Sequence, residues 1–158
     1  MKNTLQSAPI GHTWININSF MRKYMSVMPM DLFTDLQKIE LNGTNRVALT
    51  TSTIEYLNSI LEERKAQNKK LSQCASLNNK GIAYEKNNKI NLAIKTYEKN
   101  IELGYPAHHS FKRLMILYRK NKDYANERCV ILRALEVFPD WSEYVDRLNK
   151  IEQLICRK

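Results

Sequence analysis

The sequence predicts an all-α protein, and three observations support this fold class. The chain of 158 residues contains only 4 Gly and 4 Pro, too few for the tight turns of a β-sandwich or barrel. Apolar residues make up 43% and charged residues 26% of the chain, which is ordinary for one domain with its own core. Apolar residues recur every three or four positions along most of the chain, which is the spacing of one helix face.

Composition also restricts the surroundings and the partners of the chain. No stretch approaches the ~20 apolar residues of a membrane span, and residues 1–17 lack the apolar centre of a signal peptide. We therefore expect an intracellular, cytoplasmic protein without a membrane partner. Cys74, Cys129 and Cys156 are too widely spaced for a disulfide framework or paired zinc ligands, and we expect reduced core thiols. By itself, a formal net charge of +9 allows nucleic acid, an acidic peptide or a membrane surface as partner.

Residues 1–52 are expected to form a partly helical N-terminal extension, whose packing the sequence leaves open. Residues 1–17 carry no sustained periodicity and indicate an irregular arm with one short extended piece. Two helix patterns follow, at 18–28 and 31–41. Residues 46–51 are β-branched enough for a strand or an extended linker, and the pattern does not decide between the two.

A helical domain is predicted for residues 53–158. Ser52 and Glu55 have the spacing of a capping box, in which each side chain binds the free backbone N–H of the other residue at a helix start. A helix over 53–68 follows, with an apolar face and a charged end that we expect to be solvated.

Beyond Leu71 the sequence repeats with a period of 34 residues. Five identities recur at this spacing: Ile82, Tyr84, Lys86, Asn87 and Glu102 return as Ile116, Tyr118, Lys120, Asn121 and Glu136. Polar breaks at 87–88 and 121–123 divide each copy into two helices, and breakers at 104–106 and 138–139 end the copies. A period of this length predicts helical hairpins.

The repeated segment, about Leu71 to Pro139, resembles the tetratricopeptide repeat family. The first copy has the hydrophobic, glycine, aromatic, alanine and second aromatic residues at the family's intervals: Leu77, Gly81, Tyr84, Ala93 and Tyr97. The second copy matches through Phe111, Leu114, Tyr118, Ala134 and Pro139. Met115 departs from the family's glycine, and Glu127 and Asn100 depart from its alanines. The resemblance implies a short solenoid of two helical hairpins.

A C-terminal capping helix is expected from residue 140. Asp140 and Glu143 have a cap-like spacing, and a long apolar face with a charged opposite face follows, as the end of a solenoid requires. Because about three repeats are usually needed for an independent stack, we expect the 53–68 helix to pack on the other end as a half-repeat. A homodimer is the alternative.

The sequence lacks the constellations that are typical of enzymes. His12, His108 and His109 have no Cys or acid at metal-ligand spacing. Glycine-rich phosphate loops and a nucleophile elbow are also missing, and the adjacent Glu62 and Glu63 have no apolar enclosure to raise a pKa. We therefore expect a non-catalytic protein without metal or cofactor.

The resemblance implies a concave groove lined by the first helix of each copy. Carried over to this chain, the partner-binding residues are Asn78, Ile82, Glu85 and Lys86 with Lys112, Ile116, Arg119 and Lys120. Such a groove would be basic with two isoleucines at its floor, which predicts an interaction adaptor for an acidic or apolar partner segment. The family's chaperone-binding members have Asn where Ile82 and Ile116 lie, so their terminal-carboxylate clamp is not expected.

A basic stripe supports a second function. Its five cations are Lys112, Arg113, Arg119, Lys120 and Lys122. The stripe could serve a nucleic-acid-associated regulatory protein, or it is an ordinary solvated helix face. The tyrosines of the repeats match core positions and are therefore not expected to stack on bases.

Overall fold

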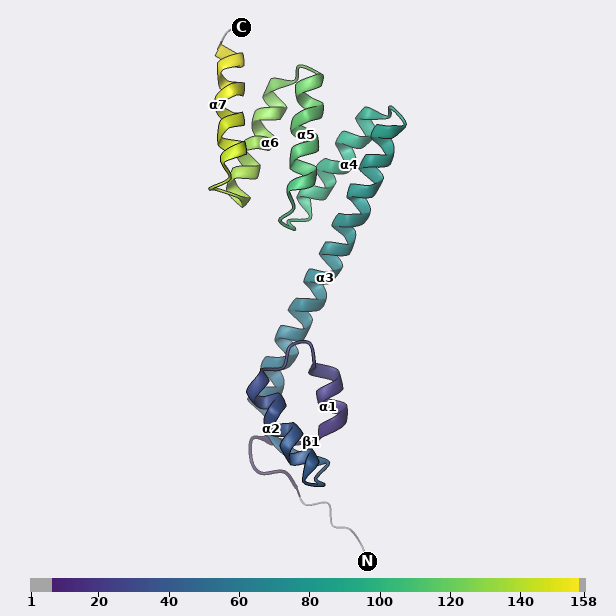
Figure 1. Cartoon of the computed structure of the whole chain (residues 1–158), viewed down its shortest axis with the longest axis vertical. Helices are drawn as coiled ribbons and strands as arrows, with labels where there is room; N and C mark the ends of the chain where they lie inside the picture. Colours follow the sequence, from purple (N-terminus) through teal and green to yellow (C-terminus); the bar gives the residue numbers. More distant parts are fainter. Residues whose placement is uncertain (1–6, 157–158) are drawn as a thin grey trace, which may run out of the picture. The chain divides into compact units, whose positions relative to one another are not determined.

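The computed structural model describes residues 7–156, and most of them are helical (Figure 1). The elements, in chain order, are β1 (His12–Asn16), α1 (Ile17–Tyr24), α2 (Met30–Leu41), β2 (Arg46–Thr50), α3 (Thr51–Lys86), α4 (Ile90–Glu102), α5 (His108–Lys120), α6 (Tyr124–Val137) and α7 (Ser142–Cys156). The predicted all-α class is confirmed, with one small two-stranded sheet in the described part. The chain divides between Ala66 and Gln67 into two compact units, each with its own hydrophobic cluster.

The first unit contains the strand pair, α1, α2 and the beginning of α3. The strands β1 and β2 are antiparallel, with Trp14 opposite Ala48, so the segment that was open between strand and linker is a strand. The side chain of Asn16 caps α1 by accepting a hydrogen bond from the backbone N–H of Ser19. The core of this unit includes Phe20 and Tyr24.

Helix α3 is longer than predicted at both ends. It begins at Thr51, and its first turn is capped by Thr50, whose Oγ1 accepts a hydrogen bond from the backbone N–H of Thr53 at 3.2 Å. The expected end near residue 68 is wrong, because one helix continues to Lys86. Within α3, residues 62–73 are all exposed.

The predicted half-repeat role of the 53–68 helix is also not found. Leu57 and Leu61 are buried in the cluster of the first unit, together with Ile17 and Leu36. The apolar face of this helix is therefore covered within the first unit.

The second unit consists of the C-terminal part of α3 and helices α4 to α7, which pack on one another in chain order (Figure 1). Leu114, Met115, Ile131 and Tyr144 are fully buried in its cluster. Helix α7, the predicted capping helix, buries Tyr144 and Ile151 in the same cluster. Tyr84, which we expected in the core, is only partly buried against the cluster.

The turns within the two hairpins have the same backbone geometry, 34 residues apart. Asn88 and Lys122 are the non-glycine residues with positive φ in the described part, at 55° and 57°. The hydrogen bonds that close the turns correspond in pairs: Lys89 N–H donates to Tyr84 O at 2.8 Å, and Asp123 N–H donates to Tyr118 O at 2.9 Å. Both helices therefore end in a left-handed residue, a common way to end a helix.

This geometry predicts that Lys122→Gly stabilises the protein by about 0.5–1 kcal/mol. A Cβ in the left-handed region costs about 1–2 kcal/mol, which exceeds the entropy that glycine adds to the unfolded chain. Urea unfolding followed by circular dichroism measures the difference. Arg133→Gly, in the exposed interior of α6, is the matched control and should lose about 1 kcal/mol. A loss of stability in Lys122→Gly would contradict the expectation.

Side-chain volumes in the two hairpins are complementary. A Cβ at Gly81 would lie 2.4 to 2.9 Å from three ring atoms of Tyr97. In the second hairpin, the positions 34 residues later are occupied by Met115 and Ile131, both fully buried. A larger residue on the first helix of the hairpin is thus accompanied by a smaller residue on the second, which accounts for the departure at Met115.

The cysteines are only partly as expected. All three are free thiols, but only Cys74 is buried, whereas Cys129 and Cys156 are exposed. The prediction of core thiols was therefore wrong for two of them, because each lies on the solvent side of its helix.

Candidate functional site

The predicted groove residues lie on two helices of the second unit, four on the C-terminal part of α3 and four on α5. Lys86 and Lys120 are exposed, and the other six side chains are half-buried. Leu114 and Tyr118, on the other side of α5, are buried. The predicted residues therefore share the accessible side of their helices. Their polar side chains differ in the hydrogen bonds and ion pairs that they form.

Asn78 belongs to a polar network between helices. Its Oδ1 accepts hydrogen bonds of 2.7 Å from Asn100 Nδ2 on α4 and from Ser110 Oγ on α5. The amide of Asn100 also donates to the backbone oxygen of Cys74 at 3.1 Å. The asparagine in place of the family's alanine thus joins three helices, and the Asn78 oxygen is already used.

Glu85 is held in an ion pair at the junction of α3 and α5. Arg113 donates from Nε to Oε1 at 2.9 Å and from Nη2 to Oε2. Tyr97 O–H, from α4, donates to the same Oε1 at 2.7 Å. The hydrogen bond from Arg113 is the main cause that lowers the pKa of Glu85. This junction pairs one acid with one base and has no net charge.

Lys112 reaches the capping helix. Its Nζ lies 2.6 Å from Glu143 Oε2 of α7, and this contact lowers the pKa of Glu143. Three of the five cations in the basic stripe, Lys112, Arg113 and Arg119, therefore have carboxylate partners from other helices. The stripe contains no acids in the sequence because these three carboxylates lie outside residues 112–122.

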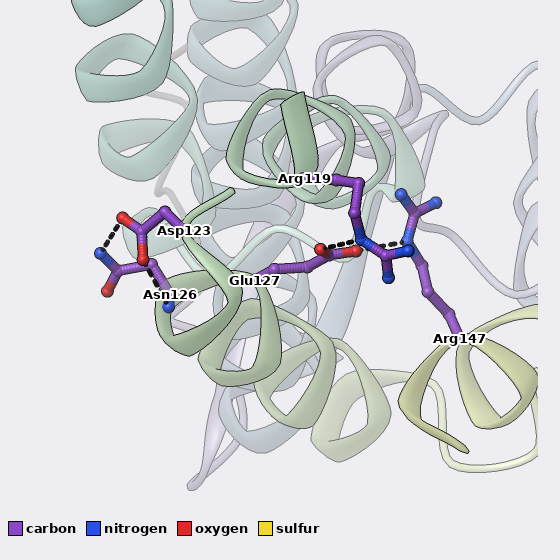
Figure 2. A network of polar contacts seen from close by, with 5 residues as sticks. All are labelled: Arg119, Asp123, Asn126, Glu127 and Arg147. Carbon is purple, nitrogen blue, oxygen red and sulfur yellow. Dashed lines mark hydrogen bonds and ion pairs between the residues drawn. The ribbon is translucent and has the colours of Figure 1, made fainter. Parts of the chain in front are cut away.

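At the junction of α5 and α7, two arginines share one buried carboxylate (Figure 2). Arg119 Nε donates to Glu127 Oε2 at 2.5 Å, and Arg147 Nε donates to Oε1 at 3.1 Å. The Glu127 side chain is 0% exposed, whereas those of Arg119 and Arg147 are 32% and 23% exposed. Figure 2 shows the two guanidinium groups next to each other at the end of the Glu127 side chain. We call these three residues the arginine–glutamate cluster.

The start of α6 places Glu127 in this position. Asp123 caps the helix, since its Oδ1 accepts a hydrogen bond of 3.2 Å from the backbone N–H of Asn126 (Figure 2). Glu127 follows in the first turn, where the helix dipole favours a negative charge. The departure from the family's alanine thus supplies an acid between two helices that each contribute a base.

The two junctions correspond position by position but differ in charge. Arg119 lies 34 residues after Glu85, and Arg147 lies 34 residues after Arg113. The first junction therefore has an acid and a base, whereas the second has two bases and receives its acid from α6. The arginine–glutamate cluster carries a formal net charge of +1.

Arg119 and Arg147 line a cleft of about 230 Å³ between α5 and α7, whose other lining residues are Glu143, Asp146 and Lys150. Glu143, Asp146 and Lys150 of α7 are not among the groove residues that the sequence predicts. The 34-residue spacing could have found them, since Asp146 and Lys150 follow Lys112 and Ile116 by one period. The positions that correspond to the predicted groove residues thus continue onto α7.

Two other kinds of structural feature are absent from residues 7–156. No group of three His, Cys, Asp or Glu side chains there is placed to hold a metal ion. None of the helices in the same range combines the length and apolar character that crossing a membrane requires. No family model matches the chain, and no curated protein sequence matches it.

Proposed function

We propose that the chain is a non-catalytic interaction adaptor of the tetratricopeptide type. Its groove, formed by the C-terminal part of α3 with α5 and α7, would bind an acidic or apolar segment of a partner protein. The observation that carries the proposal concerns Ile82 and Ile116. Both are half-buried at corresponding positions, and neither belongs to the described hydrophobic cluster of the second unit.

The charges around the two isoleucines favour an acidic segment. Lys86 and Lys120 are exposed at corresponding positions, and neither takes part in the ion pairs described for residues 7–156. The two lysines would attract carboxylates to the groove, while the isoleucines would provide apolar contact. Nucleic acid is less favoured, since phosphates would compete with the carboxylates that already hold Lys112 and Arg113.

The proposal predicts that Ile82→Ala and Ile116→Ala each weaken peptide binding. A selection of random dodecapeptides displayed on phage against the full chain supplies the probe, and titration of the enriched peptide supplies the affinity. Each variant should lose about 1–2 kcal/mol of binding free energy if the partner desolvates the side chain. Lys86→Glu together with Lys120→Glu should weaken an acidic peptide further and make the remaining binding less sensitive to salt.

Leu92→Ala is the matched control, because Leu92 is a large apolar residue of α4 that is 45% exposed. Its affinity for the same peptide should equal that of the wild type. Equal affinity in all the groove variants would contradict the proposal. Binding of a single-stranded oligonucleotide that falls log-linearly with salt would favour the nucleic-acid function instead.

A further inference from the structure

We infer that the arginine–glutamate cluster binds one carboxylate group, which an acidic side chain of the partner segment would supply. The inference rests on the proposed function, because the cluster lies beside the groove residues of α5. It goes beyond that function by placing one carboxylate of the partner in the cleft between α5 and α7.

Arg119 and Arg147 each have hydrogen-bond donors that Glu127 does not engage. A guanidinium group has five N–H donors in a fixed planar arrangement. In the cluster, the hydrogen bonds to Glu127 come from the Nε atoms of Arg119 and Arg147. Within residues 7–156, no hydrogen bond is described for the Nη groups of either arginine, so these groups are available to a ligand in the cleft. Carboxylate oxygens match paired N–H groups of this kind.

The charge balance of the cleft indicates a monoanion. The cluster carries +1, and around it Lys112 is paired with Glu143, while Lys150 and Asp146 contribute one charge of each sign. These seven residues together therefore carry a formal charge of +1, which one carboxylate neutralises. A phosphate dianion would leave an excess negative charge next to Glu143 and Asp146.

The buried Glu127 makes the site preorganised. Two neighbouring guanidinium groups repel each other, and the shared carboxylate holds them together in the free protein. The rotamers of both arginines are then fixed before a ligand arrives, which reduces the entropy lost on binding. The first junction has no surplus positive charge, because Glu85 neutralises Arg113 and already accepts hydrogen bonds from two of its nitrogens.

Sodium acetate titrated into the full chain at constant ionic strength tests the inference. The Nε–H resonances of Arg119 and Arg147, observed by ¹H–¹⁵N NMR, should shift saturably, whereas the resonance of Arg113 should not. Arg147→Gln should weaken acetate binding by about tenfold or more, because half of the donors are lost. Arg113→Gln is the matched control and should bind acetate like the wild type.

Three outcomes would overturn the inference: no saturable shift with acetate, an equal shift at Arg113, or tighter binding of inorganic phosphate than of acetate. Arg147→Lys, which keeps the charge, should still bind more weakly than the wild type if the planar donors matter. The test is independent of the groove peptide. If acetate binds but Ile82→Ala does not weaken peptide binding, the groove is rejected and the carboxylate site is retained. If Ile82→Ala weakens peptide binding but acetate does not bind, only the carboxylate site is rejected.

Discussion

Glu127→Ala should destabilise the second unit by about 3 kcal/mol, as judged by urea unfolding. Removing one member of a buried ion pair typically costs about 3–5 kcal/mol, because the remaining charge is left without compensation. The lower end applies here since Arg119 and Arg147 keep 32% and 23% of their side-chain surface exposed and can partly rehydrate. Glu136→Ala, an exposed residue of the same helix, should change stability by no more than about 0.5 kcal/mol.

A triple variant separates charge from packing in this cluster. Replacing Arg119, Glu127 and Arg147 together by Met removes all three charges and keeps most of the side-chain volume. Its stability should be close to that of the wild type, because apolar groups can replace a buried ionic cluster without loss. If the triple variant unfolds as easily as Glu127→Ala, lost packing and not uncompensated charge explains the effect.

Gly81→Met should also destabilise the second unit by about 3 kcal/mol, the upper end for an overpacked core. Even the Cβ of a new side chain would lie 2.4 Å from a ring carbon of Tyr97. Adding Tyr97→Ile recreates the pair that the second hairpin has in Met115 and Ile131. The double variant should recover part of the loss, although it gives up the hydrogen bond from Tyr97 to Glu85.

A double-mutant cycle with Tyr97→Ile alone gives the coupling energy between the two positions. Residues in direct contact typically couple by about 0.5–3 kcal/mol, whereas distant residues are additive. Ala83→Met is the matched control on the exposed surface of α3, and it should stay within about 0.5 kcal/mol of the wild type. Strictly additive effects of the two substitutions would show that helix α4 moves aside instead of resisting the new side chain.

The helix ends in the second unit could be predicted because their signals are local. Asn87 and Asn121 begin short polar breaks at the repeat period, and the left-handed turns follow directly after them. Helix α3 could not be predicted in the same way. Residues 62–73 are exposed on all sides, so the apolar periodicity disappears there and imitates the end of a helix, although the hydrogen-bonded backbone continues.

The electrostatics of the candidate site could be predicted only in part. The family resemblance predicted Arg119 and Lys112 as groove cations, but their acids lie on other helices: Glu127 follows Arg119 by eight residues, and Glu143 follows Lys112 by thirty-one. Which charges meet depends on how α5, α6 and α7 pack. The available signal was an acid at a position where the resembling family has alanine, since such a buried acid needs a partner.

The separate hydrophobic clusters of the two units have a consequence for unfolding cooperativity. Each unit can lose its structure in its own transition, and one free energy derived from the total helix signal would then combine two equilibria. The chain has 2 Trp: Trp14 lies in β1 of the first unit, and Trp141 directly precedes α7 of the second. Fluorescence of Trp14→Phe and Trp141→Phe variants therefore provides one spectroscopic reporter for each equilibrium.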